Sequence, residues 1–107
     1  MSLIVGSETT VGQTTAETTI TTYTASAGDF LRGFHVWGEQ ECEVAVYIGS
    51  NIKHIDVIGV VYASATNRGR CGYSFTPIAL SASDVVTIKI TKTENAAADD
   101  TFRGVLY

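Results

Sequence analysis

The sequence has no long hydrophobic run, no excess of basic residues and no export signal. No apolar stretch approaches the roughly 20 residues of a membrane-spanning helix. The segment Met1–Val5 lacks both the basic start and the length of a signal peptide. The net charge is −4, whereas a phosphate-binding surface usually brings an excess of Lys and Arg. We therefore expect no membrane partner and no nucleic acid as a partner.

Cysteine and histidine are scarce, with two residues of each. Cys42 alternates in phase with the apolar residues that follow it, as a small buried hydrophobic residue does. Because no export signal is present, we expect Cys42 and Cys71 to be reduced thiols rather than a disulfide. No C-x-x-C spacing accompanies them, so no zinc site is expected.

Sequence signatures of catalysis are also missing. His35 and His54 each stand alone on a strand-like segment, without a partner at the spacing of a catalytic or metal-binding pair. No serine lies in a G-x-S-x-G motif. The glycines form no phosphate-binding loop. We therefore expect no catalytic residues and no cofactor.

Two acidic groups need a separate assessment. Glu39, Glu41 and Glu43 flank a turn, where two of them could act as acid and base. We prefer the interpretation that they are solvated charges that discourage pairing between sheet edges. Asp99 and Asp100 lack the D-x-D-x-D-G spacing of a calcium loop. The sequence thus predicts no metal site and no enzyme.

What the chain does contain is a pattern of short strands. It has 107 residues, of which 45% are hydrophobic, enough for one domain with its own core. Turn residues recur about every ten positions and no stretch sustains a helical period, which predicts an all-β fold of seven to eight strands. The expected architecture is an antiparallel β-sandwich or jelly roll. We expect an extended N-terminal arm over residues 1–16, with strand pairing near residues 2–6, and a single jelly-roll domain over residues 17–107.

The clearest pattern runs from Leu31 to Gly49. Two alternating segments flank the turn at residues 38–41, and we expect them to form a hairpin. Gly33 stands where the alternation changes phase, which is typical of a β-bulge. The opposite phase sends Trp37, Tyr47 and Glu43 outward. The residues expected on the buried face are Leu31, Phe34, Val36, Val44, Val46 and Ile48.

Further strands are expected at residues 17–25, 73–76, 85–91 and 101–107. Residues 52–62 are either one long strand bent at Gly59 or two short strands. Pro77 either ends the regular pairing of its strand or places that strand at a sheet edge. Residues 64–72 predict a polar loop with Arg68 and Arg70, which either bind a carboxylate on a partner or are simply solvated.

Four aromatic residues are the best candidates for a contact surface: Trp37, Tyr47, Tyr62 and Tyr107. On the outer face of a sheet, a large aromatic side chain more often marks a contact than an accident. The alternative is that the second sheet or the N-terminal arm covers these residues.

Three C-terminal segments carry a family resemblance. They are Gly72-Tyr73-Ser74-Phe75, Asp84-Val85-Val86-Thr87-Ile88 and Thr101-Phe102-Arg103-Gly104-Val105-Leu106-Tyr107. They resemble the G-x-Y-x-F, G-D-x-V and F-x-G-x-L strands of the C1q/TNF-type trimeric jelly roll, although Ser83 stands where that family has Gly. The resemblance implies a homotrimer whose three-fold axis is lined by the closing strand, with Phe102, Gly104 and Tyr107, and with Gly104 allowing close backbone approach.

The layout of most of the chain resembles small β-sandwich (jelly-roll) virion proteins of tailed bacteriophages. The shared features are a Thr-rich start, the strand Leu31–Gly38, the turn Gly49-Ser50-Asn51, an Arg-bearing loop, a Ser-x-x-Asp turn at Ser81–Asp84 and a last strand with an F-x-G core. This resemblance implies a structural virion protein, foremost a phage head decoration (cement) protein that stabilises the capsid as a trimer.

The partners that these resemblances imply are the chain itself and the major capsid protein or another virion protein. Assembly would take place in the host cytoplasm, and the protein would end up in the virion. The alternative is a receptor- or carbohydrate-binding module of a tail fibre or baseplate, with a carbohydrate as partner. The candidate interface residues are Trp37, Tyr47, Tyr62, Arg68, Arg70, Phe102, Gly104 and Tyr107.

Overall fold

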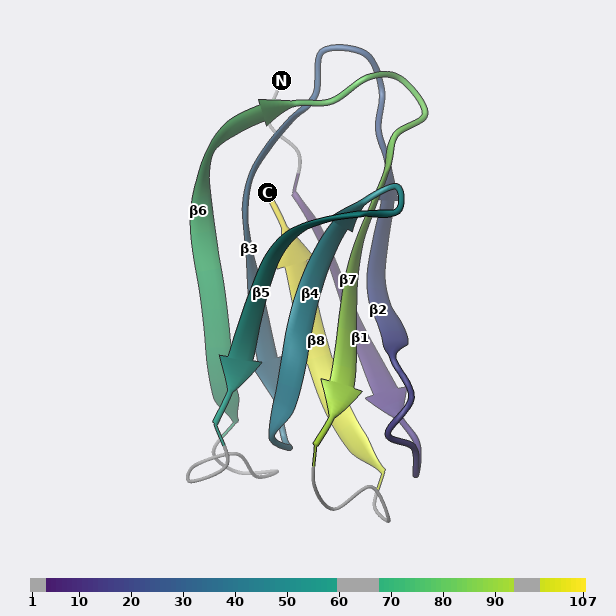
Figure 1. Cartoon of the computed structure of the whole chain (residues 1–107), viewed down its shortest axis with the longest axis vertical. Helices are drawn as coiled ribbons and strands as arrows, with labels where there is room; N and C mark the ends of the chain where they lie inside the picture. Colours follow the sequence, from purple (N-terminus) through teal and green to yellow (C-terminus); the bar gives the residue numbers. More distant parts are fainter. Residues whose placement is uncertain (1–3, 60–67, 94–98) are drawn as a thin grey trace.

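Two four-stranded antiparallel sheets pack face to face in the computed structural model, which describes residues 4–59, 68–93 and 99–107 (Figure 1). The predicted all-β sandwich is confirmed. No helix within these ranges has the length and apolarity to cross a membrane. The strands are β1 (Val5–Val11), β2 (Thr18–Thr24), β3 (Phe30–Gly38), β4 (Cys42–Ile48), β5 (Asn51–Ile58), β6 (Gly69–Ala79), β7 (Val85–Lys92) and β8 (Asp100–Leu106).

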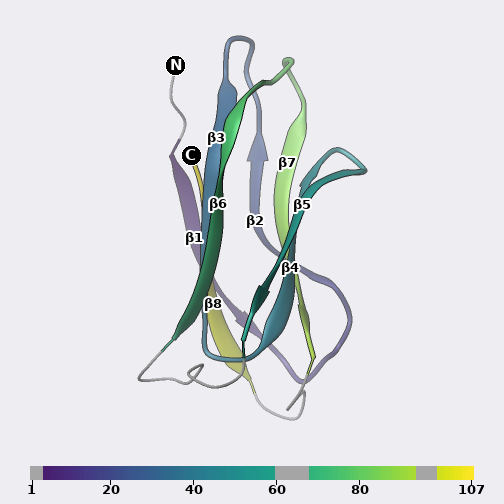
Figure 2. The same ribbon diagram turned by 60° about the vertical axis from the view of Figure 1, so that its left-hand side comes forward.

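The strand order is that of a jelly roll. Sheet A has the order β1-β8-β3-β6, and sheet B has the order β2-β7-β4-β5. Among the eight described strands, only β4 and β5 are both consecutive in the chain and neighbours in a sheet; every other pair of consecutive strands is divided between the two sheets (Figure 2). On one side of the sandwich the edge strands β5 and β6 lie next to each other, and on the opposite side β1 lies against β2.

The hairpin predicted within residues 31–49 is wrong. β3 pairs with β6 and β8, whereas β4 pairs with β5 and β7. Residues 39–41 therefore carry the chain from sheet A to sheet B. The physical reason is that both strands have one apolar face, and facing each other across the sandwich buries both faces at once.

The predicted buried face is otherwise correct. Leu31, Phe34, Val36, Val44 and Val46 have no exposed surface, and Ile48 is half-buried against the core. The bulge expected at Gly33 is present, because the pairing of β3 with β6 shifts between Leu31 and Gly33. Other residues that complete the core include Ile20, Ile58, Val86, Ile88, Ile90, Phe102 and Leu106.

Several strand boundaries differ from the prediction. The strand expected near residues 2–6 is β1 at Val5–Val11, which pairs along its length with β8 and forms an edge of sheet A. Residues 69–72, expected in a loop, belong to β6, which extends through Pro77. This is possible because β6 is an edge strand, one of the two alternatives for Pro77. β5 ends at Ile58, and residues 60–62 lie outside the described residues.

Candidate functional site

The outer face of sheet A carries a ladder of aromatic rings. On β3 the side chains of His35 and Trp37 point outward, and their rings stack with centroids 5.6 Å apart and an angle of 25°. The ring of Tyr107, just after β8, lies 5.7 Å from that of His35. Tyr107 reaches this position because Gly33 has no side chain: a Cβ there would lie 2.6 Å from the phenol ring. We call Trp37, His35 and Tyr107 the aromatic ladder.

Two arginines flank the ladder at Trp37. In the register of sheet A, Trp37 lies between Arg103 on β8 and Arg70 on β6. The Arg103 guanidinium carbon lies 5.6 Å from the centre of the Trp37 ring, within the range of a cation–π contact. The Arg70 side chain is exposed. The largest outward ring of this sheet thus has a guanidinium group on each side.

His35 belongs to a row of paired residues that crosses the four strands of sheet A, and both ends of this row are glycines. This row runs from Gly6 through Val105 and His35 to Gly72. Beside Gly72 there is an open hollow of about 390 Å³, lined by His35, Arg70, Gly72, Ser74 and their neighbours. A Cβ on Gly72 would lie 3.1 Å from the His35 ring. Beside Gly6 there is a second hollow of about 420 Å³.

An ion pair crosses the outer face of sheet A. Arg68 directly precedes the edge strand β6, and its Nη1 lies 2.8 Å from Oε1 of Glu8 on β1, the opposite edge. Arg68 and Arg103 both line the hollow beside Gly6. Glu8 therefore already has a cation.

The two kinds of basic residue are divided between the sheets. Among the seven Lys and Arg residues, the three lysines lie on strands of sheet B, on β5 and β7. All four arginines lie on sheet A or, for Arg68, one residue before it. The guanidinium groups, which bind carboxylates and phosphates through paired hydrogen bonds, are thus concentrated on one side of an acidic protein.

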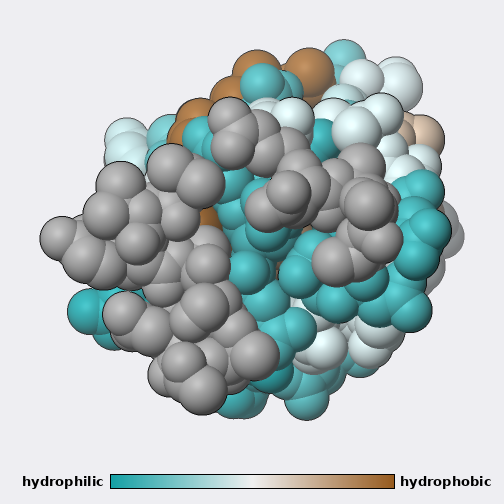
Figure 3. Space-filling model, turned by 90° about the horizontal axis from the view of Figure 1, so that it is seen from below, coloured by the Kyte–Doolittle hydropathy of each residue, from teal (hydrophilic) through white to brown (hydrophobic). Residues whose placement is uncertain are grey.

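The outer face of sheet B has a different character. On the edge strand β5, Ile52, Ile55 and Val57 are each more than half exposed, at 51%, 53% and 55%. Seen from below, hydrophobic surface gathers along the side of the molecule on which sheet B lies (Figure 3). Tyr47 lies on this face opposite Ile52, where its hydroxyl donates to Glu17 at 2.9 Å. We call Ile52, Ile55 and Val57 the β5 apolar row.

The seam between β5 and β6 closes the core on one side. The His54 ring stacks on that of Tyr73, with centroids 4.2 Å apart, and its Nε2 lies 3.8 Å from Oδ2 of Asp56. Burial raises the pKa of Cys71 and of Cys42 to about 12, so neither thiol is a nucleophile at neutral pH. The seam therefore packs the fold and offers no activated nucleophile.

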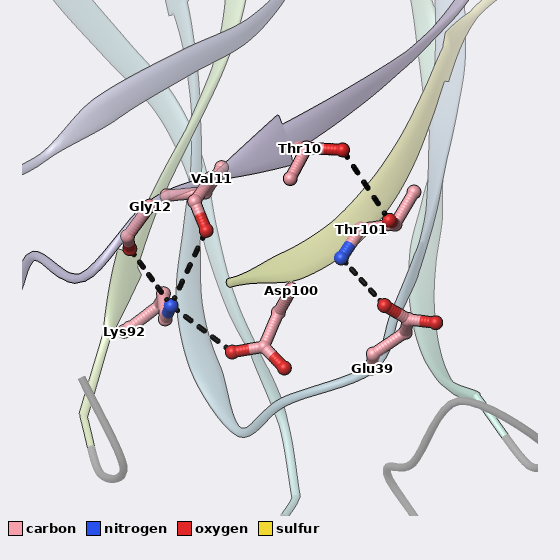
Figure 4. Close-up of polar contacts among 7 residues, drawn as sticks. All are labelled: Thr10, Val11, Gly12, Glu39, Lys92, Asp100 and Thr101. Atoms are coloured by element: carbon pink, nitrogen blue, oxygen red, sulfur yellow. Dashed lines mark hydrogen bonds and ion pairs between the residues drawn. The ribbon is translucent and has the colours of Figure 1, made fainter. Parts of the chain in front are cut away.

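An ion pair at the lower end of the sandwich joins the two sheets (Figure 4). Lys92 on β7 is fully buried, and its Nζ lies 3.0 Å from Oδ2 of Asp100 on β8. The same ammonium group donates to the carbonyl oxygens of Gly12, at 2.9 Å, and Val11, at 3.4 Å. It occupies a position among carbonyl and carboxylate oxygens that resembles the surroundings of a bound cation.

One carboxylate of the acidic turn has a structural role that the sequence did not predict. Glu39 Oε1 accepts a hydrogen bond from the backbone N–H of Thr101 at 2.7 Å, so this carboxylate holds the start of β8. Glu43 is exposed, as expected. Over the described ranges, no three His, Cys, Asp or Glu side chains are arranged to hold a metal ion.

The structure brings together only part of the candidate interface. Trp37, Arg70 and Tyr107 share the outer face of sheet A, and Arg68 crosses it. Tyr47 lies on the opposite side of the molecule, and Tyr62 lies outside the described residues.

Phe102 and Gly104 face the core instead of a partner. Phe102 has no exposed surface, and a Cβ on Gly104 would collide with Oγ1 of Thr21 in the other sheet. The role expected for Gly104 at a three-fold axis is therefore replaced by close approach of the two sheets within one chain.

Sequence reasoning missed two members of the outer face, His35 and Arg103. His35 shares the phase of Trp37, so strand alternation was a usable signal for it. Arg103 had no such signal, because its place beside Trp37 depends on the pairing of β8 with β3, which are far apart in the chain.

Comparisons with protein-family models and with curated proteins find no match to this chain.

Proposed function

We propose that this protein is a structural virion protein, a phage head decoration (cement) protein that forms a homotrimer and stabilises neighbouring capsid subunits. The observation that supports it is the β5 apolar row, which an isolated chain leaves in water. The jelly roll is also an architecture of viral capsid domains. Because fold alone does not define function, the argument depends on this surface.

The β5 apolar row is unusual in its position. An edge strand has unpaired backbone groups, and proteins normally protect such strands with charges, bulges or a covering element. β5 has one charge of this kind, because Lys53 lies at the register shift next to Ile52. The outward positions that follow it on the strand are occupied by the apolar residues Ile55 and Val57. Contiguous apolar surface of this kind marks contacts between proteins.

Covering the row would favour an assembled state. Burying the exposed half of each side chain contributes roughly 1 kcal/mol per residue. That sum is small for one contact, but cyclic symmetry repeats it at every junction, and each further contact with a capsid subunit adds to it. In this way many weak contacts stabilise the assembled particle.

The proposal is tested by light scattering at micromolar concentration with Ile55→Lys and a matched control, Val85→Lys. Val85 is also exposed and apolar, but it lies on β7 rather than on the row. We expect the wild type and Val85→Lys to be trimers and Ile55→Lys to be monomeric. Electron microscopy of the source particle should show the chain in groups of three on the head. A monomer in solution that also occurs singly in the particle would refute the trimer.

A further inference from the structure

We propose that the outer face of sheet A binds an acidic saccharide. Its carboxylate or sulfate groups would bind Arg70 and Arg103, and its sugar rings would lie against the aromatic ladder. This inference goes beyond the assembly role, which uses the β5 apolar row on the other sheet.

The charge of this face is opposite to that of the whole molecule. The protein has a net charge of −4, yet the face carries Arg70 and Arg103, while its carboxylate Glu8 is already paired with Arg68. Within the described ranges, no carboxylate lies within ion-pair distance of Arg70 or Arg103. Both guanidinium groups can therefore bind an external anion, with two parallel hydrogen bonds each.

The spacing of the two cations favours a saccharide over a nucleic acid. Arg103, Trp37 and Arg70 lie side by side on three adjacent strands, so the two arginine backbones are about 10 Å apart. A sugar ring at the outer edge of Trp37 then has a cation on each side, since Arg103 already lies over the indole ring. This suits a polymer whose anionic groups are separated by sugar rings. A nucleic acid has a phosphate on every residue and normally requires a larger excess of basic charge.

The hollow beside Gly72 supplies the remaining contacts. It is an open depression of about 390 Å³ rather than an enclosed cavity, so a ligand there would stay partly in solvent. The His35 ring borders it, and the Ser74 hydroxyl and the Arg70 guanidinium offer hydrogen bonds. A pyranose has both an apolar ring face and hydroxyl groups, so it complements such a mixture of ring and polar side chains.

The single tryptophan of the chain makes the site directly observable. Trp37 is the only source of tryptophan fluorescence, so its emission reports ligand at the proposed surface. The probes are a short oligosaccharide that alternates glucuronate with N-acetylglucosamine, a neutral glucose oligosaccharide of equal length, and single-stranded oligothymidylate. We expect the acidic oligosaccharide to change the emission, and its binding to weaken as salt is raised.

Arginine variants test the contacts. We expect Arg70→Gln and Arg103→Gln each to weaken binding by about tenfold, as loss of a charged hydrogen bond does. The control is Arg32→Gln, in the same sheet, because the Arg32 guanidinium lies over the Phe30 ring at 5.7 Å, and its contact with Tyr107 is made by the backbone N–H, which the substitution keeps. It should bind like the wild type. Thermal unfolding confirms that each variant is folded, and Arg70→Lys replaces any variant that is not.

Four results would overturn the proposal. They are no binding of the acidic oligosaccharide, equal binding of the neutral one, equal or tighter binding of oligothymidylate, and Arg70 and Arg103 variants that behave like Arg32→Gln. The third result would assign the surface to nucleic acid instead. Because the proposed binding face lies on sheet A and the β5 apolar row lies on sheet B, failure of saccharide binding is distinguishable from failure to form trimers.

Discussion

At the residue scale, Lys92 and Asp100 form a buried ion pair in which each charge depends on the other. Taking an ammonium group and a carboxylate out of water is costly, and their mutual attraction offsets that cost only while both are present. The carbonyl oxygens of Val11 and Gly12 also accept hydrogen bonds from Lys92 Nζ. This pair is therefore a position where one substitution leaves a charge buried alone.

We expect Lys92→Met to destabilise the fold by roughly 3–5 kcal/mol, because Asp100 would lose its cation. The control is Lys89→Met on the same strand. Lys89 forms a longer, partly exposed pair with Glu17 at 3.8 Å, so its loss should cost less than about 1 kcal/mol. Urea unfolding of both variants measures the difference. Equal losses would contradict the importance of the buried pair.

A second residue-scale contact gives the fold a dependence on pH. Asp29 accepts hydrogen bonds from the Tyr23 hydroxyl and from the backbone N–H of Ser26. The Tyr23 hydrogen bond, followed by the Ser26 one, lowers the pKa of Asp29 below its ordinary value of 3.8. Since the folded pKa lies below the unfolded one, this stabilisation is present at neutral pH and is lost as the pH falls through the folded value.

We therefore expect Asp29→Asn to unfold with a urea midpoint that changes less between neutral pH and pH 3 than that of the wild type. Tyr23→Phe should also reduce the dependence of the urea midpoint on pH, but by less, since it removes only the first of the two hydrogen bonds to Asp29. The measurement is the urea midpoint at a series of pH values. An Asp29→Asn profile as steep as that of the wild type would show that other carboxylates cause the acid sensitivity.

At the scale of elements, β8 shows how one glycine lets two sheets pack closely. Gly104 lies on β8 between Phe102 and Leu106, both fully buried. Thr21 Oγ1, on β2 of the other sheet, donates to the Gly104 carbonyl oxygen at 3.1 Å and is 3.0 Å from the hydroxyl of Ser7. A side chain at position 104 would displace this bonded hydroxyl.

We expect Gly104→Ala to cost roughly 1–3 kcal/mol, because the new methyl group overpacks the space in front of Thr21. Gly28→Ala provides a contrast, since a Cβ at Gly28 meets no atom within 4 Å and any cost there comes from its positive φ of 89°. Combining Gly104→Ala with Thr21→Ala should recover part of the loss. Thermal unfolding of the three variants checks this, and a double variant no better than Gly104→Ala would refute the proposed clash.

Local sequence determined which face of each strand is buried, but not which strands are neighbours. Period-two alternation and the phase change at Gly33 are properties of a few adjacent residues, and both were predicted. The pairing of β3 with β6 and β8 depends on contacts far apart in the chain, so the turn at residues 38–41 was mistaken for a hairpin. The edge position, one of the two alternatives predicted for Pro77, is correct, because proline lacks a backbone N–H and is therefore confined to the edges of sheets.

At the scale of the whole molecule, the candidate site follows from the strand order. Trp37, Arg70 and Tyr107 were singled out separately, and only the order β8-β3-β6 places them together. Lys92 shares the inward phase of Val86, Ile88 and Ile90, but its burial was not expected, because a lysine at the end of a strand is usually exposed. The sandwich reverses this expectation because Asp100, at the start of β8 in the other sheet, lies 3.0 Å from Lys92 Nζ.

The division of guanidinium groups and amines between the two sheets makes the molecule chemically two-sided. Lysine-directed acylation or surface coupling would act on sheet B, at Lys53 and Lys89, because Lys92 is buried. Arginine-directed dicarbonyl reagents would act on sheet A. A molecule immobilised through its lysine side chains would therefore keep the aromatic ladder facing the solution, whereas one attached through its arginines would hide it. Orientation on a solid support can thus be selected by the choice of reagent once the α-amino group is blocked, without altering the sequence.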